Sequence, residues 1–246
     1  MSNDVVRYNS RLDAVPLRNF TPVEMDIFWA VVSKMKRKGT KELTFGFEIF
    51  KEISHYDRRE KESFYNALKN TWDKMKQLNY QYEDESYFEE LILFQRFVID
   101  KDNEQVIIQA SERFEFILNS IGTNFTRFEL ENITKLSSGY SKELYRQLMS
   151  HRDIKHRGGA WFVKIEDFKE ILAIPNSYRM RDIDKQILKK AEKEFTTPDQ
   201  FGKPMFSVFR VEKVKARKGN KIGSLKIYFQ EPDLIPKAVS DWDPSK

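Results

Sequence analysis

The sequence contains no cysteine, only three histidines and no long run of apolar residues. The lack of cysteine excludes disulfide bonds, thiolate metal sites and a cysteine nucleophile. No apolar stretch approaches the roughly 20 residues that a membrane-spanning helix needs. The first ten residues also lack the apolar stretch of a secretory signal, so the sequence favours a cytoplasmic protein that contacts no membrane.

Motifs of two enzyme classes are missing as well. There is no G-x-x-x-x-G-K-[ST] phosphate-binding loop, which argues against ATP-driven DNA unwinding. A rolling-circle nickase needs a nucleophilic tyrosine and two metal-binding histidines that are separated by one residue. His55, His151 and His156 do not have that spacing. We therefore predict that the protein is not an enzyme and that it binds no cofactor and no metal.

Positive charge is concentrated in the second half of the chain. Residues 1–125 contain 18 Lys and Arg against 21 Asp and Glu, whereas residues 126–232 contain 23 against 14. A domain with such an excess of positive charge is typical of proteins that bind a polyanion, most often nucleic acid. The alternative is a surface charge that only keeps the protein in solution.

A heptapeptide occurs twice in the chain. Residues 47–53 read FEIFKEI and residues 165–171 read IEDFKEI, with five identical positions. A match this short can arise by chance, so the flanking sequences decide whether the chain contains a duplicated unit.

The flanking sequences predict the same order of elements in both halves: helix, short strand, helix, helix and hairpin. In the first half these lie at residues 22–38, 43–45, 47–54, 57–78 and 87–110. The first helix begins with a capping box at Thr21 and Glu24. In the second half the elements lie at residues 141–152, 160–164, 165–174, 179–195 and 204–230, and Gly158-Gly159 is expected to break the chain before the strand.

Three helices followed by a β-hairpin are the arrangement of a winged helix-turn-helix domain. We therefore predict an α+β fold with two tandem, pseudo-symmetric winged helix-turn-helix domains. Any other small α+β domain is the alternative. In helix-turn-helix proteins the later helix of the pair enters the major groove, which is wide enough to admit it.

The helix predicted at residues 179–195 is the better candidate for reading DNA. On a helical wheel its apolar residues share one face and its lysines lie opposite. Asp184 falls on the apolar face, so we expect the first turn to lie at the rim of the core. Arg and Gln can read base edges, and Lys mostly holds phosphates. With a basic wing and a basic loop, the predicted DNA-binding residues are Tyr178, Arg179, Arg181, Lys185, Gln186, Lys189, Lys193, Lys155, Arg157, Lys213, Lys215, Arg217, Lys218 and Lys221.

The corresponding helix and hairpin of the first half are less suited to DNA. The helix has mixed charge, and the predicted hairpin carries an apolar run at residues 91–94. The same hairpin has an acidic rim, which consists of Glu83, Asp84, Glu85, Glu89 and Glu90. Acidic residues would repel DNA, so this combination favours contact with protein, including a second copy of the chain. The alternative is that the apolar run is covered by its own domain.

Three segments are similar to parts of one known family. LDAVPLRNFTPVEMDIFWAVVSKM looks like the family's opening helix, NFTRFELENITKLSSGYSKELYRQL like its junction between domains, and FKEILAIPNSYRMRDIDKQILKKAEKEF like its second recognition unit. The chain resembles the initiator proteins of iteron-containing, theta-replicating plasmids, the RepB/RepE-type Rep family. It departs from the family pattern after Leu188, where Lys189-Lys190 stands in place of proline or a small residue.

The resemblance implies a plasmid DNA replication initiator that binds repeated origin sequences (iterons) as a monomer. It implies autorepression by dimers, and contact with the host initiator and the replicative helicase. We place an N-terminal winged-helix domain for dimerisation and partner contact at residues 1–122. A C-terminal winged-helix domain with the major DNA contacts is placed at residues 123–232, and a flexible tail at residues 233–246.

Two other functions stay open from the sequence. The first is a winged-helix transcriptional regulator without an origin role, and the second is a rolling-circle nickase, against which the missing histidine pair argues. A DNA-packing protein without sequence preference is a weaker idea. Tandem direct repeats near the gene favour the initiator, and a lone inverted repeat favours the regulator.

Overall fold

The chain forms two compact units in a computed structural model. Unit 1 consists of Met1–Ser150 and Phe168–Ser177, and unit 2 consists of His151–Asp167 and Tyr178–Lys246. The structure describes residues 5–9, 12–13, 17, 19–53, 61–83, 85–119, 125–217 and 221–232. The predicted domain boundary between residues 122 and 123 and the predicted tail at 233–246 lie outside the described residues.

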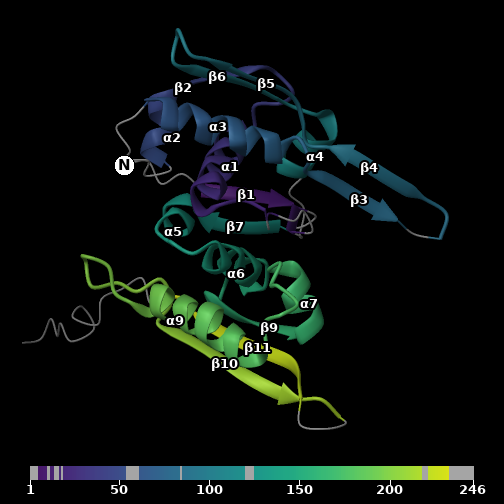
Figure 1. Cartoon of the computed structure of the whole chain (residues 1–246), viewed down its shortest axis with the longest axis vertical. Coiled ribbons are helices and arrows are strands. Elements are labelled where there is room, and N and C mark those ends of the chain that lie inside the picture. Colours follow the sequence, from purple (N-terminus) through teal and green to yellow (C-terminus); the bar gives the residue numbers. More distant parts are fainter. Residues whose placement is uncertain are drawn as a thin grey trace, which may run out of the picture. The chain divides into compact units, whose positions relative to one another are not determined.

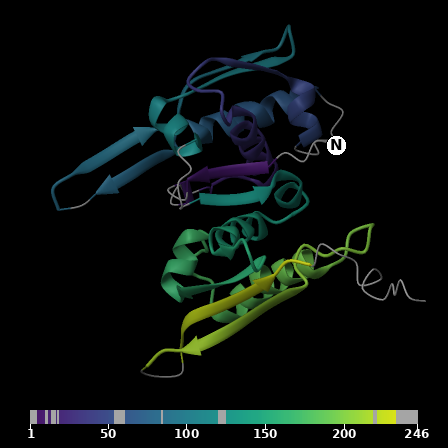
Figure 2. The ribbon, with the colours of Figure 1, turned by 180° about the vertical axis from the view of Figure 1, so that it is seen from behind.

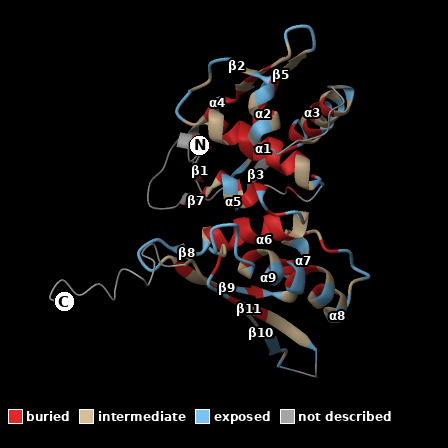
Figure 3. Cartoon of the chain, turned by 90° about the vertical axis from the view of Figure 1, so that its left-hand side faces the viewer, coloured by how far each residue is buried: buried red, intermediate tan, exposed pale blue. Residues whose placement is uncertain are grey.

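Most residues of helix α1 (Pro22–Met35) in unit 1 are buried (Figure 3). Its first turn is held by the predicted capping box. The Glu24 amide donates to the Thr21 hydroxyl at 3.4 Å, and the Thr21 amide donates to the Glu24 carboxylate at 2.6 Å. Both otherwise unpaired amides are thereby satisfied, so the helix begins at a fixed residue.

A two-stranded sheet packs against α1 and was not predicted. Strands β1 (Val5–Asn9) and β7 (Phe125–Glu129) pair antiparallel although they are far apart in the sequence. Trp29 of α1 lies between Tyr8 of β1 and Phe128 of β7, at ring-centroid distances of 5.4 and 5.3 Å. The three rings fill the centre of the unit, and aromatic pairs of this geometry add to the stabilisation that burial gives.

The predicted order of a winged helix is confirmed in unit 1 (Figure 1). After α1 the elements are β2 (Leu43–Gly46), α2 (Phe47–Ile53), α3 (Lys61–Met75), β5 (Phe94–Asp100), β6 (Gln105–Ala110) and α4 (Glu112–Asn119). Strands β5 and β6 form the hairpin wing, and β2 pairs with the other edge of β6. The predicted start of the third helix, at residues 57–60, lies outside the described residues.

The hairpin predicted at residues 87–110 is wrong in its first half, because two strands of different sheets occupy residues 88–100. Strand β4 (Phe88–Ile92) pairs with β3 (Asn79–Glu83), whereas β5 pairs with β6. Leu93 between them is fully buried, and its carbonyl oxygen accepts a hydrogen bond from the Ser111 amide at 3.0 Å. Leu93 thus lies at the junction where β4 stops and β5 begins. The β3–β4 hairpin extends away from the rest of unit 1 (Figures 1 and 2).

Because β4 and β5 belong to different sheets, the acidic rim does not lie on the β5–β6 wing. Within the described residues the rim lies on the β3–β4 hairpin, at Glu83, Glu85, Glu89 and Glu90. Asp84 lies outside the described residues. In the apolar run, Leu93 and Phe94 are buried, whereas Ile92 is 56% exposed. The prediction of an acidic, apolar wing in the first half is therefore corrected, because half of the run belongs to the core.

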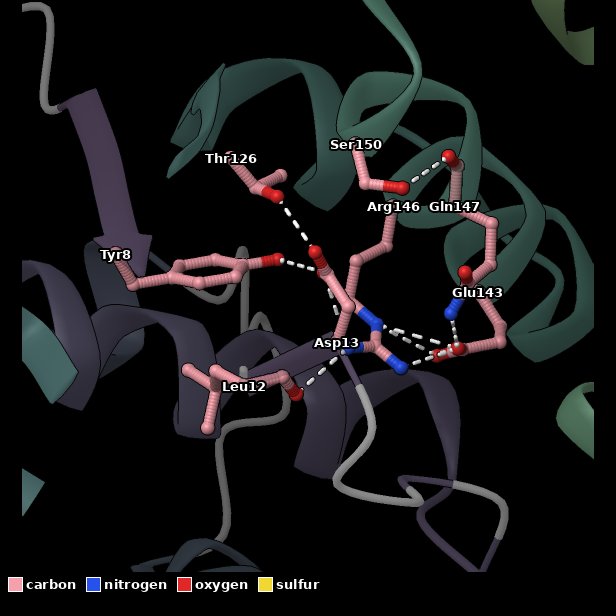
Figure 4. A network of polar contacts seen from close by, with 8 residues as sticks. All are labelled: Tyr8, Leu12, Asp13, Thr126, Glu143, Arg146, Gln147 and Ser150. Carbon is pink, nitrogen blue, oxygen red and sulfur yellow. Dashed lines mark hydrogen bonds and ion pairs between the residues drawn. The ribbon is translucent and has the colours of Figure 1, made fainter. Parts of the chain in front are cut away.

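Helix α6 (Gly139–Ser150) follows the short helix α5 (Leu130–Thr134) in unit 1, and it carries a buried arginine. The guanidinium of Arg146 pairs with Glu143 of the same helix and with Asp13, at 3.4 Å for the latter. The Asp13 carboxylate also accepts from the hydroxyls of Tyr8 at 2.9 Å and Thr126 at 2.6 Å (Figure 4). Burial raises the pKa of Asp13, while Arg146 and the two hydroxyls oppose that rise.

A second buried ion pair lies between α6 and α1. The Lys142 ammonium donates to the Asp26 carboxylate at 2.6 Å and to the carbonyl oxygen of Ile133 at 2.7 Å. Burial raises the pKa of Asp26 to about 7, against the lowering effect of Lys142. Because both partners are shielded from water, removal of either leaves a costly buried charge.

Unit 2 is an antiparallel sheet covered on one face by a long helix (Figures 1 and 2). The strands lie in the order β10 (Val208–Lys215), β11 (Ile222–Gln230), β9 (Gly158–Lys164) and β8 (Arg152–Asp153). This helix covers residues 180–196. Its Phe195 packs on Phe206 and Phe209, and the ring centroids are 5.2 Å apart in both pairs. The predicted hairpin is confirmed, and the core of the unit lies between it and the helix.

The two glycines at 158 and 159 do not break the chain, which corrects the prediction. They begin β9, where a Cβ at Gly158 would lie 2.7 Å from the Phe229 carbonyl oxygen and one at Gly159 would lie 2.3 Å from that of His151. Close strand pairing on both edges thus requires glycine here. Helix α7 (Ile165–Ile171) follows directly, is the second heptapeptide copy, and spans the division between the two units.

Candidate nucleic-acid interface

The helix predicted at residues 179–195 forms over 180–196 in three consecutive segments. They are α8 (Met180–Ile183), a π-helical turn η2 (Asp184–Leu188) and α9 (Lys189–Thr196). The Arg179 amide donates to the Asp182 carboxylate at 2.9 Å, which satisfies one of the amides at the helix start. The apolar face is buried as predicted, at Ile183, Ile187, Leu188, Ala191 and Phe195.

The π-helical turn accounts for Asp184 on the predicted apolar face. Such a turn closes hydrogen bonds between residues five apart and so holds one more residue than an α-helical turn. Ile183 and Leu188, five residues apart, both face the core, and Asp184 between them lies at its edge. Its side chain is 26% exposed and pairs with Lys213 at 2.5 Å. The expectation that the first turn lies at the rim of the core is confirmed.

The outward side of this helix carries cations along its whole length. Its exposed cations are Arg179, Arg181, Lys185, Lys189, Lys190 and Lys193. Tyr178 and Gln186 are half-buried, so each presents part of its side chain to solvent. The exposed side of the helix is therefore mainly basic, with Glu192 exposed among its lysines and two partly covered polar groups.

The wing lies beside the first half of this helix. The Lys213–Asp184 pair joins strand β10 to the π-helical turn. The tip is closed by a hydrogen bond from the Ala216 amide to the Lys221 carbonyl oxygen at 2.9 Å, after an irregular pairing at Val214 and Lys215. The wing cations Lys213, Lys215, Arg217 and Lys221 are exposed, and Lys218 lies outside the described residues. The helix start and the wing thus form one basic surface.

The basic loop that contains Lys155 and Arg157 does not join this surface. The β9–β11 register pairs Gly158 with Gln230 and Lys164 with Ser224, so the loop lies at the opposite end of β9 from the wing tip. At about 3.3 Å per residue, that strand separates the two by ~20 Å. Arg157 is also held by Glu231 at 3.1 Å, whereas Lys155 is exposed.

Sequence reasoning missed the outer face of the unit 2 sheet. Phe162 is 62% exposed there, and its ring meets that of Tyr228 at a centroid distance of 6.0 Å. The guanidinium of Arg210 lies 4.8 Å from the Tyr228 ring centre, and the Lys226 ammonium lies 5.7 Å from that of Phe162. The sequence feature that could have predicted this face is the alternation of apolar and polar residues in β9 and β11, which indicates that one face of the sheet is exposed to solvent.

Within the described parts of the chain, no three His, Asp or Glu side chains are placed to hold a metal ion. No helix among the described residues is long and apolar enough to cross a membrane.

Two family descriptions match most of the chain. "Initiator Replication protein, WH1" matches residues 5–149, and "Initiator Rep protein, WH2" matches residues 164–229. Both matched segments end inside the described structure, and between them they include both copies of the heptapeptide.

A curated protein and a solved structure are also similar. The chain is 30% identical over 178 residues to the "Probable replication protein rep" of Bifidobacterium longum (strain NCC 2705), which covers 72% of this chain and 59% of that protein. The chain therefore spans about three-fifths of that relative's length. A crystal structure of the Pi initiator protein in complex with iteron DNA has the same fold, with a TM-score of 0.74 at 15% identity. The match covers 95% of this chain and 99% of that one.

Proposed function

This chain belongs to the family of initiator replication proteins, with its two winged-helix domains, and from that premise we propose that it is a plasmid replication initiator that binds iterons. The observation that carries the proposal is the basic surface formed by the helix of residues 180–196 and the wing beside it. A solved relative of the same fold was crystallised with iteron DNA, which supports the choice of ligand.

The geometry of this surface suits a duplex. An α-helix fits the major groove, and a hairpin beside its start can reach the neighbouring backbone. Arg179 and Arg181 stand at the helix start, where base edges are most often read. Lys185, Lys189 and the wing lysines supply phosphate contacts, which fix the register of the helix in the groove.

The roles of the two domains follow the family in our proposal. The C-terminal winged helix makes the major contacts with duplex origin DNA. The N-terminal winged helix carries the homodimer contact, and dimers repress the gene of the protein. The host initiator and the replicative helicase are recruited at the origin. The protein acts in the cytoplasm by binding and distorting DNA, without cleaving it.

A gel-shift titration with the purified protein tests the proposal. The probe is the DNA that flanks its own gene, at two salt concentrations and with non-specific competitor. A ladder of discrete bands on direct repeats is expected, because each repeat takes one protein. Binding to any duplex that disappears at the higher salt would leave only a non-specific electrostatic interaction and would contradict the initiator.

Two substitutions locate the recognition surface. Arg181→Ala and Lys185→Ala each remove one exposed cation of the helix and should weaken repeat binding by ~1–3 kcal/mol per good contact. Lys203→Ala, in the exposed turn after the helix, is the matched control and should change little. Equal affinities for all three variants and the unchanged protein would show that DNA binds elsewhere.

A further inference from the structure

Strand β10 is the outermost strand of the unit 2 sheet within the described residues (Figure 1). A strand at the edge of a sheet presents backbone amide and carbonyl groups that can pair with a strand of another chain. The pairing of β10 with β11 is regular from Val208 to Val214, and its register shifts between Val214 and Lys215. The regular part of this edge therefore has Val211 at its midpoint.

Four side chains of β10 share the outer face of the sheet. Side chains alternate along a strand, and Phe209 is buried on the inner face. The outer face therefore carries Val208, Arg210, Glu212 and Val214. Val208 is 49% exposed and Val214 is 37% exposed, and the side chains of Arg210 and Glu212 are 63% and 43% exposed. A second chain that pairs with this edge would thus meet all four side chains.

The order of these four side chains is complementary to itself. Read forward from Val208 it is apolar, basic, acidic and apolar, and read backward it is apolar, acidic, basic and apolar. In an antiparallel pair of two copies centred on Val211, Arg210 of each copy lies opposite Glu212 of the other. Val208 of each copy then lies opposite Val214 of the other. Opposite charges and apolar side chains that face each other across two strands both stabilise the pair.

The same order selects one register. If the two-fold axis moved by one residue along the strand, Glu212 would lie opposite Glu212, or Arg210 opposite Arg210. Like charges that lie directly opposite each other destabilise a strand pair. On the inner face, Lys213 is paired with Asp184 of its own helix at 2.5 Å, so its charge is balanced within each copy. The pairing centred on Val211 is therefore favoured over its neighbours.

We propose that two copies of the chain associate through β10, in an antiparallel pairing centred on Val211. The sheet of one copy continues into the sheet of the other, and the same residues of both copies form the contact, as in a two-fold symmetric dimer. Backbone hydrogen bonds supply the affinity and the outer-face side chains supply the specificity. A contact of one strand pair is small, so the association is weak and reversible. It is separate from the N-terminal homodimer contact and does not rest on the proposed function.

The first experiment measures association of the whole protein by sedimentation velocity over a range of concentrations. Arg210→Glu brings acids opposite each other in the dimer, and Glu212→Arg brings bases opposite each other. Each variant alone should lower the association constant about tenfold. An equimolar mixture of the two variants should associate as the unchanged protein does, because each opposed pair again contains one acid and one base. Lys164→Glu, an exposed position on β9 away from the edge, is the matched control and should have no effect.

The second experiment uses the lack of cysteine in the chain to test the register. Val211→Cys places the introduced thiol opposite its own copy, where the Cα atoms of opposed residues lie about 4.5–5.5 Å apart, within the range of a disulfide. Mild oxidation should therefore give a covalent dimer. Val208→Cys is the control, because its two copies lie about 20 Å apart in the same pairing. Val208 is more exposed than Val211, so random collisions would cross-link the control more readily.

Three results would overturn the proposal. The first is an unchanged protein that does not associate, or that associates no better than both charge variants. The second is a loss of association that the mixture does not restore, and the third is equal cross-linking of Val208→Cys and Val211→Cys. An N-terminal contact by itself predicts that all the charge variants sediment as the unchanged protein does. Because no DNA is present, failure to bind repeats would contradict the proposed function and leave these results unaffected.

Discussion

Phe50 and Phe168 occupy the same position in the two heptapeptide copies, and both are fully buried. The Glu at the second position of each copy is exposed, at Glu48 and Glu166. The repeat thus preserves a side chain that fills a core and charges that face water. The burial of these residues could be predicted from the sequence, because a phenylalanine in an amphipathic helix lies on the apolar face that packs against the core.

Replacement of Phe168 by alanine should destabilise the protein by ~3–5 kcal/mol, because it removes a large buried ring and leaves a cavity. Urea unfolding followed by circular dichroism measures the change. Glu166→Ala, on the exposed side of the same helix, should stay within about 0.5 kcal/mol. Similar losses for the two variants would contradict the packing described for this helix.

The buried pair of Asp26 and Lys142 gives stability a dependence on pH. The pKa of Asp26 is about 7 in the folded protein, well above its ordinary value, so the folded state binds a proton that the unfolded state releases. Stability should therefore fall as pH rises from about 4 to about 7, by at most ~1.4 kcal/mol per pH unit.

Asp26→Asn isolates this contribution. Asn resembles the protonated form of Asp26 and cannot titrate, so the stability of the variant should vary less between pH 4 and pH 7. Urea titrations of both proteins at several pH values give the comparison. Parallel curves for the two proteins would show that Asp26 titrates at its ordinary pKa.

Among the elements, sequence reasoning predicted those that rest on local patterns. The capping box, the heptapeptide helices and strand β11 form where they were expected. The β1–β7 pair was missed because its partners are far apart in the sequence, and no local pattern announces such pairing. The junction at Leu93 was missed because a buried break between two strands reads as one continuous apolar run.

The π-helical turn was missed for a different reason. Residues 179–195 satisfy α-helical periodicity almost everywhere, and Asp184 is the single mismatch. The prediction of the DNA-binding residues was also only partly supported by the fold. The cations of the helix and the wing were predicted as one surface and are joined by the Lys213–Asp184 pair. The loop of Lys155 and Arg157 was grouped with them on charge alone, although the strand register places it at the other end of the sheet.

The capping box of α1 should be worth about 1 kcal/mol of stability. Thr21→Ala removes the hydroxyl that accepts from the Glu24 amide and should lower the free energy of unfolding by that amount. Thr21→Ser keeps the hydroxyl and should retain most of the stability. Chemical denaturation distinguishes the two, and equal losses would mean that the hydroxyl contributes nothing.

Across the whole molecule, the compact units and the sequence repeat divide the chain differently. The repeat makes α6 the first helix of the second copy, yet α6 belongs to unit 1, where its buried cations Lys142 and Arg146 pair with Asp26 and Asp13. The predicted boundary at residue 122 would separate these cations from their partners.

A fragment of residues 123–246 should therefore fold poorly by itself. It would carry Lys142 and Arg146 on a helix face whose carboxylate partners, Asp26 and Asp13, are absent. Thermal melting by circular dichroism should show a broad transition at a lower temperature than that of the full chain. A cooperative transition close to that of the full chain would support the predicted boundary as a true domain boundary.

The π-helical turn also sets a rotational phase. Wound as an uninterrupted α-helix, residues 180–196 would turn the residues ahead of the π-helical segment by about 100° relative to those after it. Arg181 would then point about 80° away from Lys189 around the helix axis, whereas the π-helical turn brings the two closer to one line. The extra residue in the turn therefore changes which side of the helix the residues before it face. The Lys213–Asp184 pair joins this turn to strand β10 of the wing.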